Sequence, residues 1–348
     1  MKQSILIIFI ILSNLIAFGQ SREQLISEIE ATRTRIFNGF EVFLDPAKTL
    51  ESRVNAIGTF SGIYDEGQIV KVAALVFNPK EAPVIRAAAL TSLTDQVSKD
   101  KRLWDQVITW VQAPAYGKEL REAALATLEN LSFSFITQVE NRQETINTFR
   151  NLTRDSDIRF RRFALGYLSA HGDSFAQSLL IDQLDKNRTD LVPTAEAISL
   201  LALNIHGDYL PTVNSVFQSP PDTASLVQGL LVLGKYAPAK EKIVSLFTNK
   251  KIKKRIRELA LATLLNSYPD EADYLSVTVL NDKAEPEDFK ILIMMNTMYK
   301  RRAEWARYKK NGPDTLHEII KNMAESSVYP QLQKTAEEYL EMVQVVYE

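Results

Sequence analysis

The stretch ELREAALATLENLS, residues 119–132, decides the fold of this chain of 348 residues. Its arginine, Arg121, is followed by Leu125 four positions later and by Leu128 seven positions later, which is the spacing of one face of an α-helix. The same spacing recurs in VIRAAALTSLTDQV (84–97), RRFALGYLSAHGD (161–173) and RIRELALATLLNSY (255–268). An earlier copy begins at Arg53. A period of roughly 35 residues predicts stacked helical units rather than one globular core.

A second amphipathic stretch lies between consecutive copies, so each copy is expected to be a pair of helices. Breakers such as Asn78-Pro79 and Tyr268-Pro269-Asp270 separate the stretches. The chain has only 12 glycines, and strand-like alternation is hard to find, which favours an all-α fold. In the last helix, from Gln331 to about Val346, three glutamates interrupt the apolar spacing. This pattern predicts a polar C-terminal capping helix.

The repeated segments resemble the HEAT-repeat family. The resemblance rests on an acid near the turn and a basic residue early in the second helix, as in Asp157 with Arg161 and, less closely, Glu119 with Arg121. The copies that depart from this pattern lie around Thr194, Leu226 and Lys290. The resemblance covers roughly residues 45–348 and implies a right-handed α-solenoid of about eight or nine antiparallel helix pairs. It also implies a binding scaffold, although a few branches of the family are enzymes, including DNA glycosylases and bilin lyases.

The N-terminus has the pattern of a signal peptide. Lys2 precedes the apolar stretch 5–18, and Ala17-Phe18-Gly19 offers a small residue on each side of a cleavage point. An uncleaved anchor is the alternative, but the stretch is shorter than the roughly 20 residues that span a bilayer. The sequence therefore predicts a signal peptide at 1–20, a single repeat domain at 21–348 without a transmembrane segment, and export to the periplasm or the medium.

Composition narrows the possible chemistry. The chain has no cysteine, which excludes thiol nucleophiles, disulfides and thiolate metal sites. It has three histidines. His171-Gly172-Asp173 and His206-Gly207-Asp208 could form a metal site or an acid/base pair, but each is better read as a helix end with glycine in the left-handed conformation. No phosphate-binding, nucleophile-elbow or zinc-protease motif is present. We therefore predict no metal, no cofactor, no catalytic residue and no enzymatic activity.

Charge gives the strongest local hint of a binding site. Residues 235–310 carry 17 Lys and Arg against 10 Asp and Glu. The predicted binding residues are Lys253, Lys254, Arg255, Arg301, Arg302, Trp305, Arg307 and Tyr308. Stacking of neighbouring repeats could merge them into one patch for an acidic surface, or they could be ordinary solvated faces. The recurrent arginines could line a groove, but bonds to carbonyls or acids of neighbouring repeats are the favoured interpretation.

Three functions follow from these observations. The leading hypothesis is an exported, non-enzymatic scaffold or adaptor that binds a protein partner. The alternative is a protein that binds anionic lipid or phosphorylated glycan at the envelope through the basic patch of residues 250–310. A helical-repeat enzyme acting on nucleic acid ranks third, because export and the slightly acidic overall charge disfavour a nucleic-acid partner.

Overall fold

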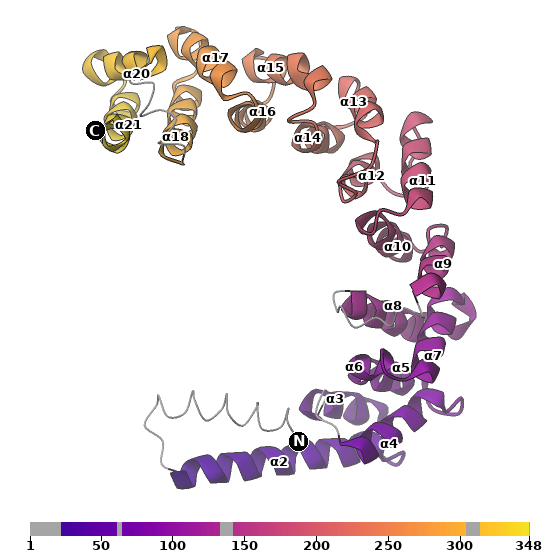
Figure 1. Cartoon of the computed structure of the whole chain (residues 1–348). Coiled ribbons are helices and arrows are strands. Elements are labelled where there is room, and N and C mark those ends of the chain that lie inside the picture. The colour runs from indigo at the N-terminus through magenta and orange to yellow at the C-terminus, as the bar shows by residue number, and fades with distance from the viewer. Residues whose placement is uncertain (1–21, 61–64, 133–141, 304–313, 348) are drawn as a thin grey trace. The chain divides into compact units, whose positions relative to one another are not determined.

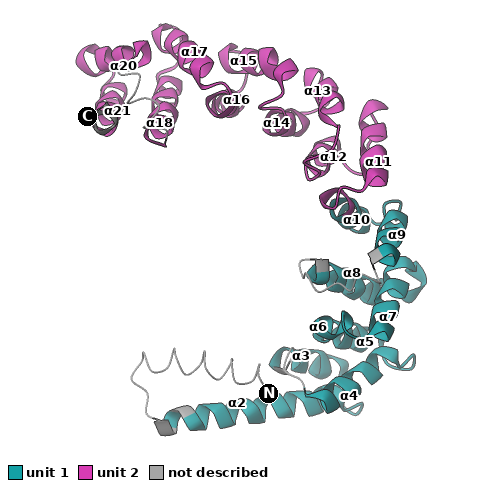
Figure 2. Ribbon diagram, in the orientation of Figure 1, with its two compact units in different colours: residues 1–167 teal, residues 168–348 magenta. Residues whose placement is uncertain are grey.

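The computed structural model describes residues 22–60, 65–132, 142–303 and 314–347, and every regular element in these ranges is a helix. The all-α prediction is therefore confirmed. The predicted signal peptide, residues 1–20, lies outside the described residues. The chain divides into two compact units, residues 1–167 and residues 168–348 (Figure 2). The division falls within one helix, α10 (Ile158–Ala170).

The helices follow one another along the chain as labelled in Figure 1. Unit 1 contains α2 (Arg22–Leu44), α3 (Leu50–Phe60), α4 (Glu66–Phe77), α5 (Pro83–Ser92), α6 (Thr94–Val97), α7 (Lys101–Gln112), the 3-10 turn η1 (Pro114–Tyr116), α8 (Lys118–Ser132), α9 (Arg142–Leu152) and the larger part of α10. Unit 2 contains the end of α10, then α11 (Ser174–Asp185), α12 (Thr194–Leu201), α13 (Leu210–Gln218), α14 (Thr223–Val232), the 3-10 turn η3 (Ala237–Ala239), α15 (Lys240–Thr248), α16 (Lys254–Ser267), α17 (Pro269–Asn281), α18 (Glu287–Ala303), α20 (Thr315–Ser326) and α21 (Pro330–Tyr347).

These helices form hairpins that stack in two rows within each unit (Figure 1). In unit 2 the second helices of successive hairpins pack side by side in the order α12, α14, α16, α18 and α21. In unit 1, α3, α5 and α8 do the same. The first helices cover this row from one side, as α15 covers α16 and α7 covers α8. Counted over the described residues there are nine hairpins, in agreement with the eight or nine that were predicted.

The leucines of the repeat fill the layer between the two rows. Leu90, Leu125 and Leu261 are all buried, and so are their partners three positions later. Small residues beside them, Ala89 and Ala260 among others, are fully buried and let the helices approach closely. The apolar spacing seen in the sequence is therefore the core of the stack.

Side-chain caps determine where several helices begin. The Asp65 carboxylate accepts from the Gln68 amide at 2.8 Å, and the Gln68 side chain accepts from the Asp65 amide in return. Asp222 caps α14 in the same way by accepting from Ser225 N at 2.7 Å. These contacts satisfy backbone donors that a helix start otherwise leaves unpaired. Along the last helix, α21, Glu337 is among the glutamates that lie exposed, whereas the apolar positions face the stack.

The two His-Gly-Asp tripeptides differ in backbone conformation. Gly172 follows α10 with a φ of 68°, the left-handed conformation expected of a helix C-cap, and Asp173 caps the next helix. Gly207 has no positive φ, and α12 ends at Leu201, well before His206. The predicted helix end was right for the first tripeptide and wrong for the second.

Candidate functional site

The repeated arginines hold the helix hairpins together. In four hairpins the arginine Nε donates to the backbone carbonyl ten residues earlier, at the end of the first helix. These bonds are Arg53 to Phe43 at 2.9 Å, Arg86 to Val76 at 3.1 Å, Arg121 to Val111 at 3.2 Å and Arg257 to Phe247 at 2.8 Å. Carbonyls in the last turn of a helix lack a partner within that helix and lie at the negative end of its dipole. A guanidinium therefore suits this position.

Three of these four guanidinium groups also reach an acid in the following hairpin. Arg257 binds Glu285 through two nitrogens, at 2.5 and 3.0 Å, and the Arg257 guanidinium lies 3.8 Å from the centre of the Phe289 ring. Arg53 binds Glu81 at 3.0 and 2.9 Å, and these hydrogen bonds lower the pKa of the Glu81 carboxyl. Arg121 binds Asp155 at 2.5 Å. The bonding between neighbouring repeats that the sequence favoured is thus present in these three hairpins.

Ion pairs also neutralise much of the predicted basic patch. Three lysines of unit 2 each pair with an acid of the next hairpin: Lys240 with Glu271, Lys250 with Asp282 and Lys254 with Asp288. Hydrogen bonds from Lys250 and Lys254 lower the pKa of the two aspartates they contact. Arg255 pairs with Glu258 one turn along its own helix, at 2.8 Å. Of the three predicted residues at the start of α16, Lys253 lies exposed at the N-cap.

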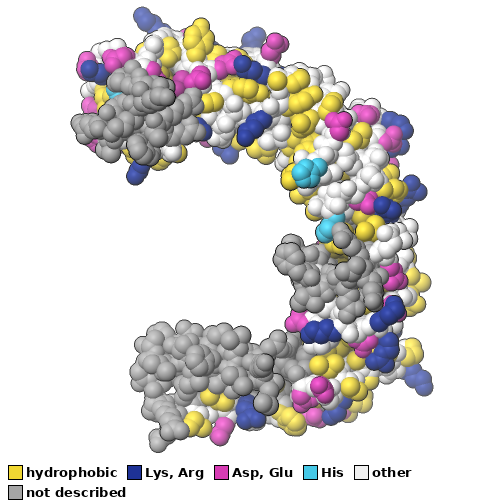
Figure 3. Space-filling view, viewed as in Figure 1, with side chains coloured by type: hydrophobic (Ala, Val, Ile, Leu, Met, Phe, Trp, Pro, Cys, Tyr) yellow, Lys and Arg dark blue, Asp and Glu magenta, His cyan; other side chains and the backbone are white. Residues whose placement is uncertain are grey.

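The structure does not bring the two halves of that patch together. Helices α16 and α18 are parallel, since Lys254 at the start of α16 pairs with Asp288 at the start of α18. Lys300 near the end of α18 meets Asn266 near the end of α16, at 3.4 Å. The first half therefore lies about 20 Å from the second, the length of α16 at 1.5 Å per residue. On the face of unit 2 shown in Figure 3, Lys and Arg are scattered among acidic and apolar side chains.

The predicted residues in the second half of the patch have different environments. Arg301 is fully buried, and its Nη2 bonds Asp314 at 2.6 Å and Asp273 at 3.3 Å. Arg302 is exposed, with Nη1 3.8 Å from the sulfur of Met342. The buried Arg301 joins α17, α18 and the start of α20, and it is closed to a partner. Trp305, Arg307 and Tyr308 lie outside the described residues.

A different surface of unit 2, on the second helices, presents large apolar side chains to solvent. Leu231 in α14 is 61% exposed, Met295 in α18 is 42% exposed and Tyr299, one turn further along α18, is 58% exposed. Leu231 and Met295 occupy equivalent positions, because each directly follows a fully buried residue of the repeat, Leu230 or Met294. We call Leu231, Met295 and Tyr299 the apolar face.

In unit 1, the repeat that contains Arg86 carries polar residues in the same register. Thr91 directly follows the buried Leu90 and is exposed, and Asp95 lies four residues further on, in the position that corresponds to Tyr299. The apolar face was not predicted from the sequence, because the repeat spacing identifies the buried positions and not the exposed ones. A signal was available: LLVL, residues 230–233, contains more apolar residues than one buried helix face requires.

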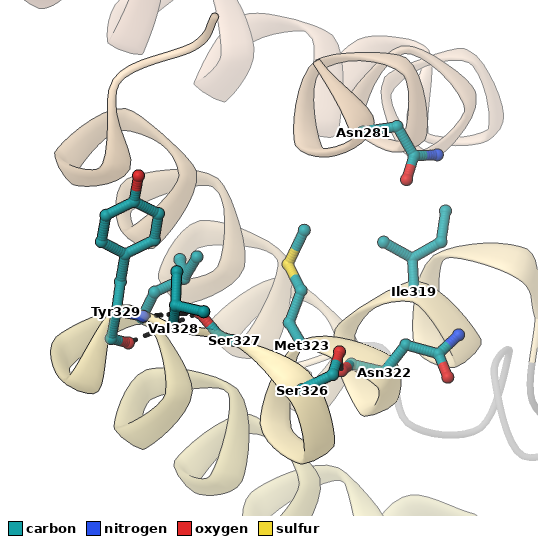
Figure 4. A pocket seen from close by; sticks show the side chains of 9 residues that line it. Asn281, Ile319, Asn322, Met323, Ser326, Ser327, Val328 and Tyr329 are labelled. Carbon is teal, nitrogen blue, oxygen red and sulfur yellow. Dashed lines mark hydrogen bonds between the residues drawn. The ribbon is translucent and has the colours of Figure 1, made fainter. Parts of the chain in front are cut away.

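A shallow recess lies near the C-terminal end of unit 2. It has a volume of about 310 Å³ and lies between the end of α17 and the turn from α20 to α21 (Figure 4). Asn281 and Asn322 contribute amides, and Met323 points into the space between the helices. Tyr329 lies at one side, with its amide bonded to the Ser327 hydroxyl at 3.2 Å. The recess offers amide and apolar groups and no charged side chain among those that line it.

Two features of the described residues bear on metals and membranes. Within the described ranges, no three His, Asp or Glu side chains are grouped as metal ligands would be. Over the same ranges, none of the helices combines the length and the apolar character that crossing a bilayer requires.

Comparison with known proteins identifies no family. No protein-family model matches the chain, and no curated protein matches it. One of the solved structures that match is human deoxyhypusine hydroxylase in complex with glycerol, at a TM-score of 0.30 and 10% sequence identity. The match covers 91% of this chain and 99% of the other.

That match corrects one prediction. The chain was expected not to be an enzyme because it has a repeat fold and lacks familiar motifs, yet the matching structure is an enzyme. The prediction of no enzymatic activity was therefore wrong as drawn, because a chain of stacked helices does not by itself argue against catalysis. At this TM-score the likeness tells us nothing about any activity of this chain.

Proposed function

We propose that this chain is an exported HEAT-repeat adaptor that binds a protein partner on the apolar face. The observation that carries the proposal is the exposure of Leu231, Met295 and Tyr299 on the second helices of unit 2. Met295 and Tyr299 lie one turn apart on α18, and contiguous exposed apolar side chains on folded proteins mark interaction sites. Aromatic residues and methionine are also enriched in protein interfaces.

Assignment to the HEAT family is part of the proposal. It is supported by the constant bond from the second-helix arginine to the carbonyl ten residues earlier and by the acid supplied from the next hairpin, as in Arg257 with Phe247 and Glu285. Export is likewise proposed, and it rests on the signal-peptide pattern of residues 1–20.

The geometry of the face indicates what kind of partner it suits. Leu231 and Met295 lie on helices separated by one intervening helix, so their backbones are about 20 Å apart if neighbouring helices pack at roughly 10 Å. Between them, Ala262 of α16 is small and half-buried. A partner that lays an amphipathic helix across the three helices would reach both large side chains and cover the alanine.

The test is affinity capture with the full-length chain from its own cells, followed by mass spectrometry. We would compare the parent with the double variant Leu231→Glu, Met295→Glu. The control is Thr91→Glu, which introduces the same residue type, and half of the added charge, at the equivalent register of unit 1. We expect the parent and the control to retain a partner. The double variant should capture at least about tenfold less of it, as for loss of an interface anchor. Equal retention by all three proteins would refute it.

A parallel arm separates the apolar face from the basic residues. The variant Lys253→Glu, Arg255→Glu reverses two exposed charges at the start of α16. If this variant, and not the apolar-face variant, loses the bound material, the adaptor proposal is wrong about the surface. Salt-dependent binding to anionic vesicles, lost in the same variant, would then favour the envelope-surface alternative.

A further inference from the structure

Arg86 differs from the other three arginines that bond a carbonyl ten residues earlier. Arg53, Arg121 and Arg257 each bind a carboxylate of the following hairpin. Arg86 makes the bond to the Val76 carbonyl and lies 4.9 Å from the centre of the Trp110 ring, but within the described ranges no carboxylate bonds it. Burial lowers the pKa of Arg86, and the neighbouring Tyr116 partly offsets this effect.

The reason for the difference lies in the sequence of the next turn. Arg86 is the repeat arginine of its own hairpin, and Glu81 stands five residues before it. In the hairpin of α17 and α18, Lys290 occupies the position of the repeat arginine, and Glu285 stands five residues before it. The residue five positions before Arg121 is Tyr116. A phenol therefore occupies the position from which the two other hairpins supply a glutamate, and a phenol carries no charge at neutral pH.

The position of the missing glutamate is open to solvent. Tyr116 is 41% exposed, and the 3-10 turn that carries it, together with Gly117, is exposed throughout. Arg86 is only half-buried, unlike the buried Arg257 of the complete arrangement. A ligand that approaches beside Tyr116 thus meets a guanidinium that is already oriented by Val76 and Trp110.

We propose that Arg86 binds the carboxylate of a ligand from outside the chain, in place of the glutamate that the other hairpins supply internally. Guanidinium and carboxylate form paired, charge-assisted hydrogen bonds, and the internal Arg53 and Arg257 pairs show that geometry in the same repeat. This carboxylate site lies in unit 1 and is separate from the apolar face of unit 2. It therefore does not depend on the proposed adaptor function.

The test is NMR of the full-length chain labelled with ¹⁵N at the arginine side chains. The Arg86 Nε–H signal is identified by its loss in Arg86→Lys. We expect it to shift saturably with sodium acetate, and not with sodium chloride at the same ionic strength. The Arg53 signal serves as an internal control, because Glu81 already occupies that guanidinium. A blocked peptide with one glutamate is titrated in parallel; tighter binding than acetate would indicate a protein side chain, and equal binding a small carboxylate ligand.

The variant Tyr116→Glu is the decisive comparison. It restores an internal carboxylate at the position used in the other hairpins, so acetate should bind Arg86 at least about tenfold more weakly than in the parent. The Arg86 signal without acetate should also move toward its acetate-bound position. The proposal is overturned if acetate and chloride act alike on the Arg86 signal, or if Tyr116→Glu leaves the response to acetate unchanged.

Discussion

Replacing Glu285 with glutamine should destabilise unit 2 far more than the same chemical change three residues away. Glu285 and Arg257 are both buried, with 1% and 5% of their side chains exposed. Removing one partner of a buried pair leaves an uncompensated charge and usually costs about 3–5 kcal/mol. Because glutamine keeps one acceptor oxygen for Arg257, we expect a loss of about 3 kcal/mol in the free energy of unfolding.

Asp288→Asn is the matched control. Asp288, at the start of α18, pairs with Lys254, at the start of α16, but 63% and 48% of these side chains are exposed. Pairs of this kind contribute about 0–1 kcal/mol. The carboxylate also lies in the first turn of α18, where a negative charge adds about 0.3–1 kcal/mol. The loss should therefore stay below about 2 kcal/mol.

Urea unfolding of the full-length chain, followed by far-ultraviolet circular dichroism, measures both effects. Hydrogen exchange at the amides of α15 and α16 shows whether the change falls on this hairpin, since a helical repeat can open locally. If Glu285→Gln and Asp288→Asn differed by less than about 0.5 kcal/mol, the usual range of a surface substitution, the buried pair would not hold neighbouring hairpins together.

Two further predictions concern packing and pH. A Cβ added at Gly229 would lie 2.5 Å from the Phe217 ring, so Gly229→Ala should lower the urea midpoint of unfolding. A Cβ added at Gly58 would have nothing within 4 Å, so Gly58→Ala should raise the free energy of unfolding by about 0.5–1 kcal/mol. Equal effects of the two variants would refute the steric argument. Burial, together with the charge of Arg301, lowers the pKa of His317 below its ordinary value of 6.5. Below pH 6.5 the imidazole of His317 is therefore protonated more fully in the unfolded chain than in the folded one, so the free energy of unfolding should fall as the pH drops from about 6.5 toward the folded pKa. In His317→Gln, the urea midpoint should fall less over this pH range. A midpoint that falls as steeply as in the parent would exclude His317 as the cause.

The sequence predicted the repeated helices well because their spacing follows directly from burial. Each Arg–Leu–Leu copy became a second helix, and Leu261 and Leu264 are both fully buried. Helix starts were less predictable. Two aspartates in turns illustrate this: Asp222 caps α14, whereas Asp270 lies inside the first turn of α17, because the preceding proline takes the first helical position.

The candidate surfaces were harder to predict because a surface depends on which ends of neighbouring helices meet. The basic residues of α16 and α18 looked like one cluster in the sequence, yet parallel packing puts Lys254 at the start of one helix and Arg302 near the end of its neighbour. Arg301 was expected at the surface and is fully buried, since Asp273 and Asp314 approach it from two other helices. No local pattern reveals contacts between such distant positions.

The constant spacing between each arginine and its carbonyl also predicts where the chain tolerates changes in length. Ten residues separate Phe247 from Arg257, as in the three other hairpins, whereas the step to the acid of the next hairpin is 28 residues for Arg257 and 34 for Arg121. The turn inside these four hairpins therefore has a fixed length, and the connection between hairpins does not. Epitope tags or reporter domains for following this protein in cells belong in the connections, and a single residue inserted within a hairpin turn would detach the guanidinium from its carbonyl.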